Sequence, residues 1–119
     1  MGFNVRKAAG DVLILDLAGE LDRHLGLQEL RGTFAKLHPG KSTRLVFNFR
    51  DVTYICSEAV GEICAIADKV RKTGGRATCC ALRGLPKNVF ELLGVPKILS
   101  SHETEDAAVR WVNEEKSPS

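Results

Sequence analysis

Long hydrophobic runs are missing from this chain of 119 residues. No stretch approaches the roughly 20 consecutive apolar residues that a membrane-spanning helix needs, so we expect no direct membrane insertion. The first residues contain neither the apolar segment of a signal peptide nor a myristoylation signal. These absences together predict a cytoplasmic protein.

A strong excess of charge is also missing. Seventeen Lys and Arg residues stand against fifteen Asp and Glu residues, which gives a formal net charge of +2. A nucleic-acid-binding domain normally carries a concentrated basic face. The nearest cluster is interpreted as the solvated end of a helix: Lys69, Arg71, Lys72 and Arg76. We therefore expect no nucleic-acid partner.

The motifs of common enzymes are absent as well. The sequence has no glycine-rich loop that would cradle a phosphate, and Ser57 lacks the flanking glycines of a nucleophile elbow. His24, His38 and His102 are far apart and show no local metal-binding spacing. Cys56 with His24 comes nearest to a Cys–His nucleophile pair, but nothing supplies an acid to orient it. We expect no catalytic residues, no metal and no cofactor.

The four cysteines give no disulfide framework by their spacing. Cys79 and Cys80 are adjacent in a predicted strand, so their thiols should point to opposite faces and cannot share one metal ion. Cys56 and Cys64 are about two helical turns apart and are also unsuited to chelation. All four are predicted to be free structural thiols.

What the sequence does contain is the pattern of a single globular domain over residues 1–119, with a frayed tail from about 116. A hairpin followed by alternating helices and strands predicts an α/β fold, with a mixed sheet of about four to five strands and helices mainly on one face. The expected strands are 3–7, 12–18, 45–49, 77–82 and 97–99. The expected helices are one carrying Leu27, Leu30, Phe34 and Leu37, one over 57–73, one from Pro86 to Gly94, and one capped by Thr104.

Several local motifs, in this order, resemble one family. They are Gly19-Glu-Leu-Asp22, Leu45-Val-Phe-Asn-Phe49 followed by Asp51-Val52, Gly74-Gly75 before an apolar strand, and Val89-Phe90 with Leu93-Gly94. The chain resembles STAS domains, specifically the stand-alone bacterial anti-sigma factor antagonists, or anti-anti-sigma factors. The resemblance runs from about Phe3 to Val112 and implies the STAS fold.

In that family the turn after the central strand reads Asp-Ser-Ser-Gly, and an anti-sigma kinase phosphorylates the second Ser. The matching residues here are Cys56, Ser57, Glu58 and Ala59, while Gly61 matches a later family glycine. Glu58 therefore stands at the phosphoacceptor position. Phosphorylation adds about −1.5 to −2 charge and breaks the family's complex with the anti-sigma factor, whereas Glu58 carries about one fixed negative charge.

Three explanations of Glu58 remain open. An acidic residue in a first helical turn is favourable in itself, by roughly 0.3–1 kcal/mol. Alternatively, Glu58 mimics the phosphorylated state and fixes one binding state. In the third explanation Ser57 has become the phosphoacceptor, although its phosphate would then lie beside a carboxylate. Ser57 is also a candidate N-cap.

The resemblance implies a non-enzymatic binding module that acts by partner switching with an anti-sigma factor or serine kinase. The alternatives are a cytoplasmic STAS subunit of a bacterial lipid ABC transporter, or a stress-signalling scaffold that does not depend on phosphorylation. The residues expected to contact a partner surround the turn: Asp22, Arg23, His24, Cys56, Ser57, Glu58, Ala59, Gly61 and Glu62.

Overall fold

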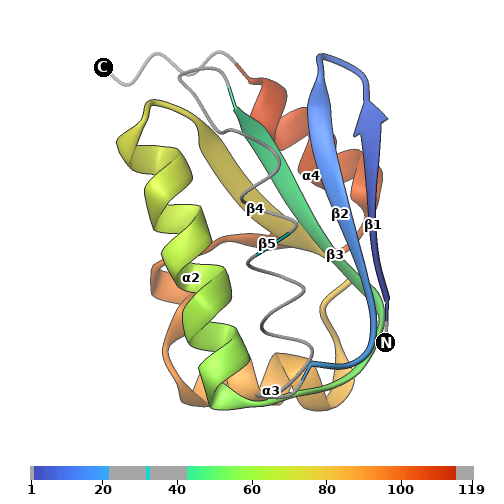
Figure 1. Ribbon diagram of the computed structural model, residues 1–119, viewed down its shortest axis with the longest axis vertical. Helices are drawn as coiled ribbons and strands as arrows, with labels where there is room; N and C mark the ends of the chain where they lie inside the picture. The colour runs from blue at the N-terminus through green and yellow to red at the C-terminus, as the bar shows by residue number, and fades with distance from the viewer. Residues whose placement is uncertain (1, 22–31, 33–42, 115–119) are drawn as a thin grey trace.

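The computed structural model describes residues 2–21, 32 and 43–114, which form an α/β domain (Figure 1). The strands are β1 (Gly2–Ala8), β2 (Val12–Leu21), β3 (Arg44–Ile55), β4 (Arg76–Cys80) and β5 (Ser101–His102). The helices are α2 (Ser57–Lys72), α3 (Gly84–Leu92), the short 3-10 helix η1 (Val95–Lys97) and α4 (Glu105–Asn113). The predicted helix around Leu27–Leu37 lies outside the described residues.

The described strands form one mixed sheet in the order β1-β2-β3-β4-β5. β1 and β2 pair as an antiparallel hairpin, and the pairs from β2 to β5 are parallel. The hairpin turns at Gly10 and Asp11, both of which have positive φ. The predicted hairpin and the predicted mixed sheet are both confirmed.

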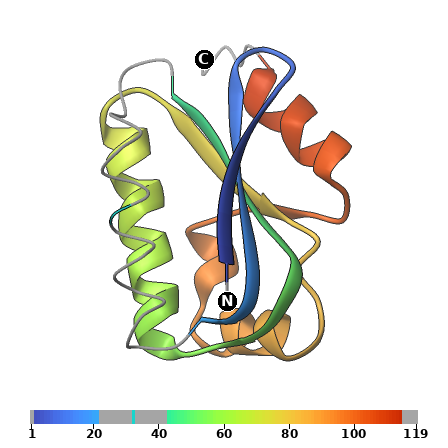
Figure 2. The same cartoon turned by 45° about the vertical axis from the view of Figure 1, so that its right-hand side comes forward.

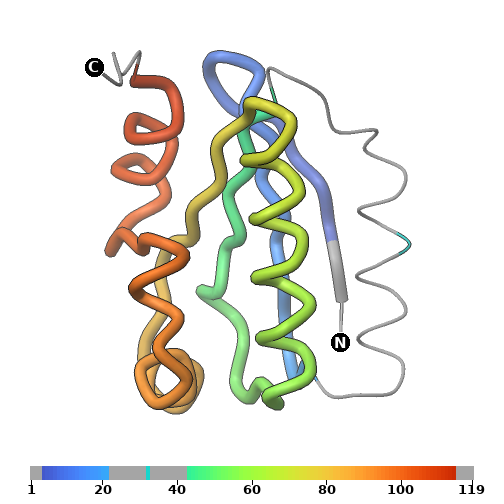
Figure 3. The backbone as a smooth tube through the Cα atoms, turned by 90° about the vertical axis from the view of Figure 1, so that its left-hand side faces the viewer, coloured from blue at the N-terminus to red at the C-terminus, as the bar shows by residue number. Residues whose placement is uncertain are grey.

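Side chains alternate along the strands between the two faces of the sheet, and each face packs in its own hydrophobic core. Leu15, Phe47 and Cys79 belong to the larger core, which α2, α3 and η1 complete. Ile14 and Val46, one position away in their strands, belong to the smaller core, which α4 completes. Two of the three described α-helices therefore lie on one face of the sheet, and α4 covers part of the other face (Figures 2 and 3).

Several boundaries differ from the predicted ones, and three of these differences matter for the site. Residues 97–99 are not a strand, because the 3-10 helix η1 runs to Lys97 and the chain pairs with β4 only at Ser101–His102. α3 begins at Gly84, two residues before Pro86, and Gly94 follows its end with φ 74°. β3 extends to Ile55, well beyond Phe49, and so carries the chain directly into α2.

Candidate partner-binding turn

The turn between β3 and α2 is fixed by backbone hydrogen bonds on both sides. The Cys56 N–H donates to the Leu21 carbonyl at 3.0 Å, which ties the turn to the end of β2. The Cys56 carbonyl accepts from the Val60 N–H at 3.0 Å, which closes the first turn of α2. The start of α2 is therefore held by two neighbouring parallel strands and has a defined position.

Cys56 is the N-cap of α2, and this corrects the prediction that Ser57 caps the helix. The Cys56 backbone is extended, with φ −91° and ψ 164°, and its Sγ accepts from the Ala59 N–H at 3.4 Å. Ser57 is already the first helical residue. Sulfur is a weak acceptor, so the helix start uses a weaker cap than Ser, Thr, Asp or Asn would give.

The residues of this turn differ strongly in solvent exposure. Ser57, Glu58 and Gly61 are exposed, and Glu62 is half-buried. Ala59 is only 2% exposed and packs in the larger core. Ala59 is therefore a core residue and not a partner contact, which corrects its place among the expected contacts. The division follows from the helical period, because one face of α2 covers the sheet.

The charges of α2 are arranged to suit its dipole. Glu58 lies in the first turn, where the helix N-terminus favours a negative charge, and Lys69, Arg71 and Lys72 lie in the last turn. This arrangement is consistent with the simplest explanation of Glu58, and it leaves the other two open. Because Glu58 is exposed, its carboxylate is also accessible to a partner.

The remaining expected contacts, Asp22, Arg23 and His24, lie outside the described residues. The last described residue before them, Leu21, pairs with Ile55 and accepts the hydrogen bond from Cys56. Their proximity to the turn stays a prediction.

The cysteines behave as structural thiols in the part of the chain that is described. Cys79 packs in the larger core and Cys80 in the smaller one, so the two thiols point to opposite faces as predicted. Burial raises the pKa of Cys79 to about 12 and the pKa of Cys80 to about 11. Both thiols are therefore neutral near pH 7, and Cys64, whose pKa burial also raises, is similar.

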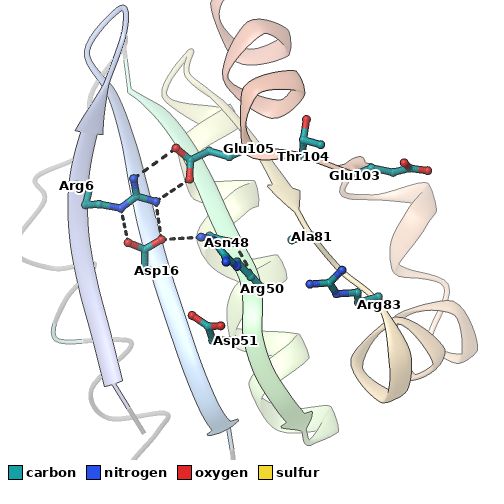
Figure 4. A pocket seen from close by; sticks show the side chains of 10 residues that line it. All are labelled: Arg6, Asp16, Asn48, Arg50, Asp51, Ala81, Arg83, Glu103, Thr104 and Glu105. Atoms are coloured by element: carbon teal, nitrogen blue, oxygen red, sulfur yellow. Dashed lines mark hydrogen bonds and ion pairs between the residues drawn. The ribbon is translucent and has the colours of Figure 1, made fainter.

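A polar pocket of about 480 Å³ lies on the sheet face that α4 partly covers (Figure 4). The Arg6 guanidinium donates to both carboxylate oxygens of Asp16 and, at 2.7 Å, to Glu105 Oε1. Asn48 Nδ2 donates to Asp16 Oδ1 at 2.7 Å. These charges satisfy one another, so this group joins β1, β2, β3 and α4 and is primarily structural.

Sequence reasoning missed this charged group. Its signal was Asp16, a single carboxylate inside the otherwise apolar run Val12–Ala18. A charge in such a strand needs a partner, but the sequence does not show which of the many basic residues comes to lie beside it.

The described residues contain neither a metal-binding cluster nor a membrane-spanning helix. No cluster of three or more His, Cys, Asp or Glu side chains that could hold a metal ion occurs among them. Within the same residues, no helix is both long enough and apolar enough to cross a membrane.

The comparison with protein families assigns the chain to a family. A model of the STAS domain family matches residues 5–108. The chain belongs to the STAS domain family. The matched residues include the turn and α2. The positions that were aligned with the family's phosphorylation motif, 56–59, therefore lie inside the matched domain.

Solved structures of other STAS proteins have the same fold. SpoIIAA, an anti-sigma factor antagonist solved in its unphosphorylated form, is 21% identical, with 93% of this chain and 96% of that chain covered and a TM-score of 0.77. An anti-sigma factor antagonist from Mycobacterium paratuberculosis is 21% identical, with 95% and 94% covered and a TM-score of 0.77. At these identities the likeness establishes the fold alone.

A transporter also contains this fold. The murine anion transporter Slc26a9, solved in its inward-facing state, is 16% identical, with 85% of this STAS domain but 17% of that chain covered and a TM-score of 0.71. The same fold therefore occurs both in separate antagonists and as a part of a larger transporter.

Proposed function

We propose that this STAS domain is a non-enzymatic regulatory module that binds an anti-sigma factor or its kinase through the β3–α2 turn. The observation that carries the proposal is the exposure of Ser57 and Glu58 at a helix start fixed by hydrogen bonds to β2 and α2. A rigid, exposed turn presents its side chains to a partner at little cost in conformational entropy. The likeness to anti-sigma factor antagonists across nearly the whole chain supports the same function.

Glu58 alters how such a module is regulated. A Ser/Thr kinase has no hydroxyl to modify at Glu58, so the usual on–off change of about two negative charges is lost at this position. Glu58 instead gives the turn one permanent negative charge. In this proposal partner binding is therefore set by Glu58 itself, and any phosphorylation would have to use the exposed hydroxyl of Ser57.

The decisive experiment is an affinity capture from native cytoplasm and detergent-solubilised membranes, with bound proteins identified by mass spectrometry. The wild type is compared with Glu58→Lys, and Glu103→Lys is the matched control because Glu103 is exposed before α4, away from the turn. We expect an anti-sigma factor or kinase to be held by wild type and Glu103→Lys, and at least tenfold less by Glu58→Lys, a difference of about 1.4 kcal/mol. Equal recovery on all three proteins would exclude the turn as the binding surface.

Calorimetry with the captured partner then separates charge from shape. Glu58→Gln keeps the size of the side chain and removes its charge, whereas Glu58→Ser restores the family's hydroxyl. If Glu58 mimics the phosphorylated state, both variants should change affinity in the same direction. Phosphate found on Ser57 after treatment with the kinase and ATP would instead support Ser57 as the acceptor.

The second candidate function is a STAS subunit of a transport complex, such as a bacterial lipid ABC transporter. The observation that favours it is the occurrence of the same fold within the anion transporter Slc26a9. Recovery of transporter subunits in the membrane capture would select this function. If a stress-signalling assembly is recovered, and in equal amount with Glu58→Lys, the result would favour the third function, a signalling scaffold.

A further inference from the structure

A second pocket, of about 500 Å³, lies between the last turns of α2 and α4. We call it the α2–α4 pocket, and it is lined by Arg71, Gly75, Arg76, Ala77, Pro96, Lys97, Ile98, Ser100 and Trp111. Figure 3 shows the start of β4 between α2 and α4. Arg71 lies near the C-terminal end of α2, so this pocket is several helical turns from Glu58, which lies in the first turn.

The charges of the α2–α4 pocket are of one sign. Arg71, Arg76 and Lys97 line it, and none of its lining residues is acidic. Lys97 is exposed, and no ion pair of Lys97 is found within the described residues. Arg71 lies 3.7 Å from the carboxylate of Asp68, which does not line this pocket. In the polar pocket, by contrast, Arg6 is paired with two carboxylates that line the pocket with it. The α2–α4 pocket therefore favours an anion.

Trp111 and Ile98 give the pocket apolar surface beside its cations. The Arg76 guanidinium carbon lies 4.1 Å from the centre of the Trp111 ring, a cation–π contact. Arg76 Nη1 also donates to the Glu114 carbonyl at 3.1 Å, which holds the guanidinium in place. The exposed side chain of Ile98 adds apolar surface, and Arg71 is fixed at the rim by its bond to the Ile98 carbonyl.

We propose that the α2–α4 pocket binds a small molecule that combines a flat apolar body with a carboxylate or phosphate group. The flat body packs against Trp111 and Ile98, and the anionic group pairs with Lys97, beside Arg71. The volume lies within the range of about 300–1,000 Å³ that is usual for small-molecule pockets. This inference does not depend on the function proposed for the turn, because no residue is shared between the two sites.

Trp111 makes the proposal directly measurable, since it is the only Trp in the chain. Phenyl phosphate and benzoate serve as probes, and they distinguish a phosphate from a carboxylate. Inorganic phosphate lacks the flat body and benzyl alcohol lacks the charge, so these two are the ligand controls. We expect a saturable change in Trp111 fluorescence with at least one aromatic anion, and NMR amide shifts confined to the residues lining the pocket.

Lys97→Gln tests the charge, with Lys87→Gln as its control, because both lysines are exposed and only Lys97 lines the pocket. We expect Lys97→Gln to weaken binding of the aromatic anion at least fivefold, which corresponds to about 1 kcal/mol, and Lys87→Gln to leave it unchanged. The proposal is overturned if neither anion saturates by about 10 mM. It is equally overturned if benzyl alcohol or inorganic phosphate binds as tightly, or if the two variants bind alike.

Discussion

Gly61 is exposed in the second turn of α2, close to Ser57 and Glu58. A Cβ placed on Gly61 would meet no atom within 4 Å, so the structure does not require glycine there. Glycine in a helix interior costs roughly 0.5–1 kcal/mol relative to alanine. A residue that is unfavourable for the helix, and not needed by it, is a reasonable candidate for close approach by a partner.

We predict that Gly61→Ala raises the free energy of unfolding by about 0.5–1 kcal/mol, measured by urea denaturation. Gly75→Ala is the contrasting control, because its Cβ would collide with the Thr43 carbonyl oxygen and should lower stability by about 1–3 kcal/mol. If Gly61 also lies in the interface, the stabilised variant should bind the captured partner more weakly. A loss of stability in Gly61→Ala would show that the helix requires glycine at this position.

The residue-scale errors of prediction have physical causes. Ser57 was a candidate N-cap because serine is a favoured cap residue, but the hydrogen bond from Cys56 to the end of β2 sets the helix start one residue earlier. Ala59 was carried over as a contact from its place in the turn motif, although the helical period turns it into the core. Both outcomes depend on tertiary contacts that a local motif does not contain.

Among the elements, long periodic segments were predictable and short ones were not. α2 and α4 were recognised from their apolar spacing and their terminal residues, and both are confirmed. β5 has two residues, too few for any periodic pattern, and residues 97–99, which contain the apolar pair Ile98 and Leu99, were predicted as the strand in its place. The α2–α4 pocket also could not be predicted, because its lining residues come from α2, β4, α4 and the segment around η1.

α4 offers a clear test at the scale of an element. Thr104 Oγ1 accepts from the Ala107 N–H at 3.1 Å and so caps the helix. We predict that Thr104→Ala lowers the free energy of unfolding by about 1 kcal/mol, whereas Thr104→Ser, which keeps the hydroxyl, lowers it much less. Circular dichroism during urea denaturation measures both. Equal losses in the two variants would mean that the methyl group, and not the cap, stabilises this end of α4.

In the whole molecule, the charged group around Arg6 joins elements that lie far apart in the sequence, the N-terminal hairpin and α4. Arg6 on β1 donates both to Asp16 on β2 and to Glu105 at the start of α4. Their bonds hold the start of α4 against the hairpin (Figure 4). At the other end of the same helix, Asn113 Nδ2 donates to the Ala9 carbonyl at 2.8 Å. α4 is thus tied to the hairpin by polar contacts at both of its ends.

The group around Arg6 predicts how stability depends on pH. The hydrogen bond from Arg6 holds the pKa of Asp16 below its usual value of 3.8, against an opposing effect of burial. A carboxylate whose pKa is lowered by folding stabilises the protein above its unfolded pKa, and this contribution is lost as the pH falls through the folded pKa. Acidification below the usual pKa of 3.8 should therefore progressively remove the contribution of Asp16.

We predict that Asp16→Asn lowers the free energy of unfolding by about 1 kcal/mol near neutral pH, a modest value because Arg6 is partly exposed. The difference between wild type and Asp16→Asn should shrink as the pH falls below about 4, since protonated Asp16 no longer attracts Arg6 as a charge. Urea denaturation at a series of pH values measures this difference. Asp106→Asn is the matched control, because Asp106 is exposed on α4 outside the group and its own small effect should not follow the same acid transition. A constant gap between wild type and Asp16→Asn across the whole range would show that shape and hydrogen bonding, and not charge, join the hairpin to α4.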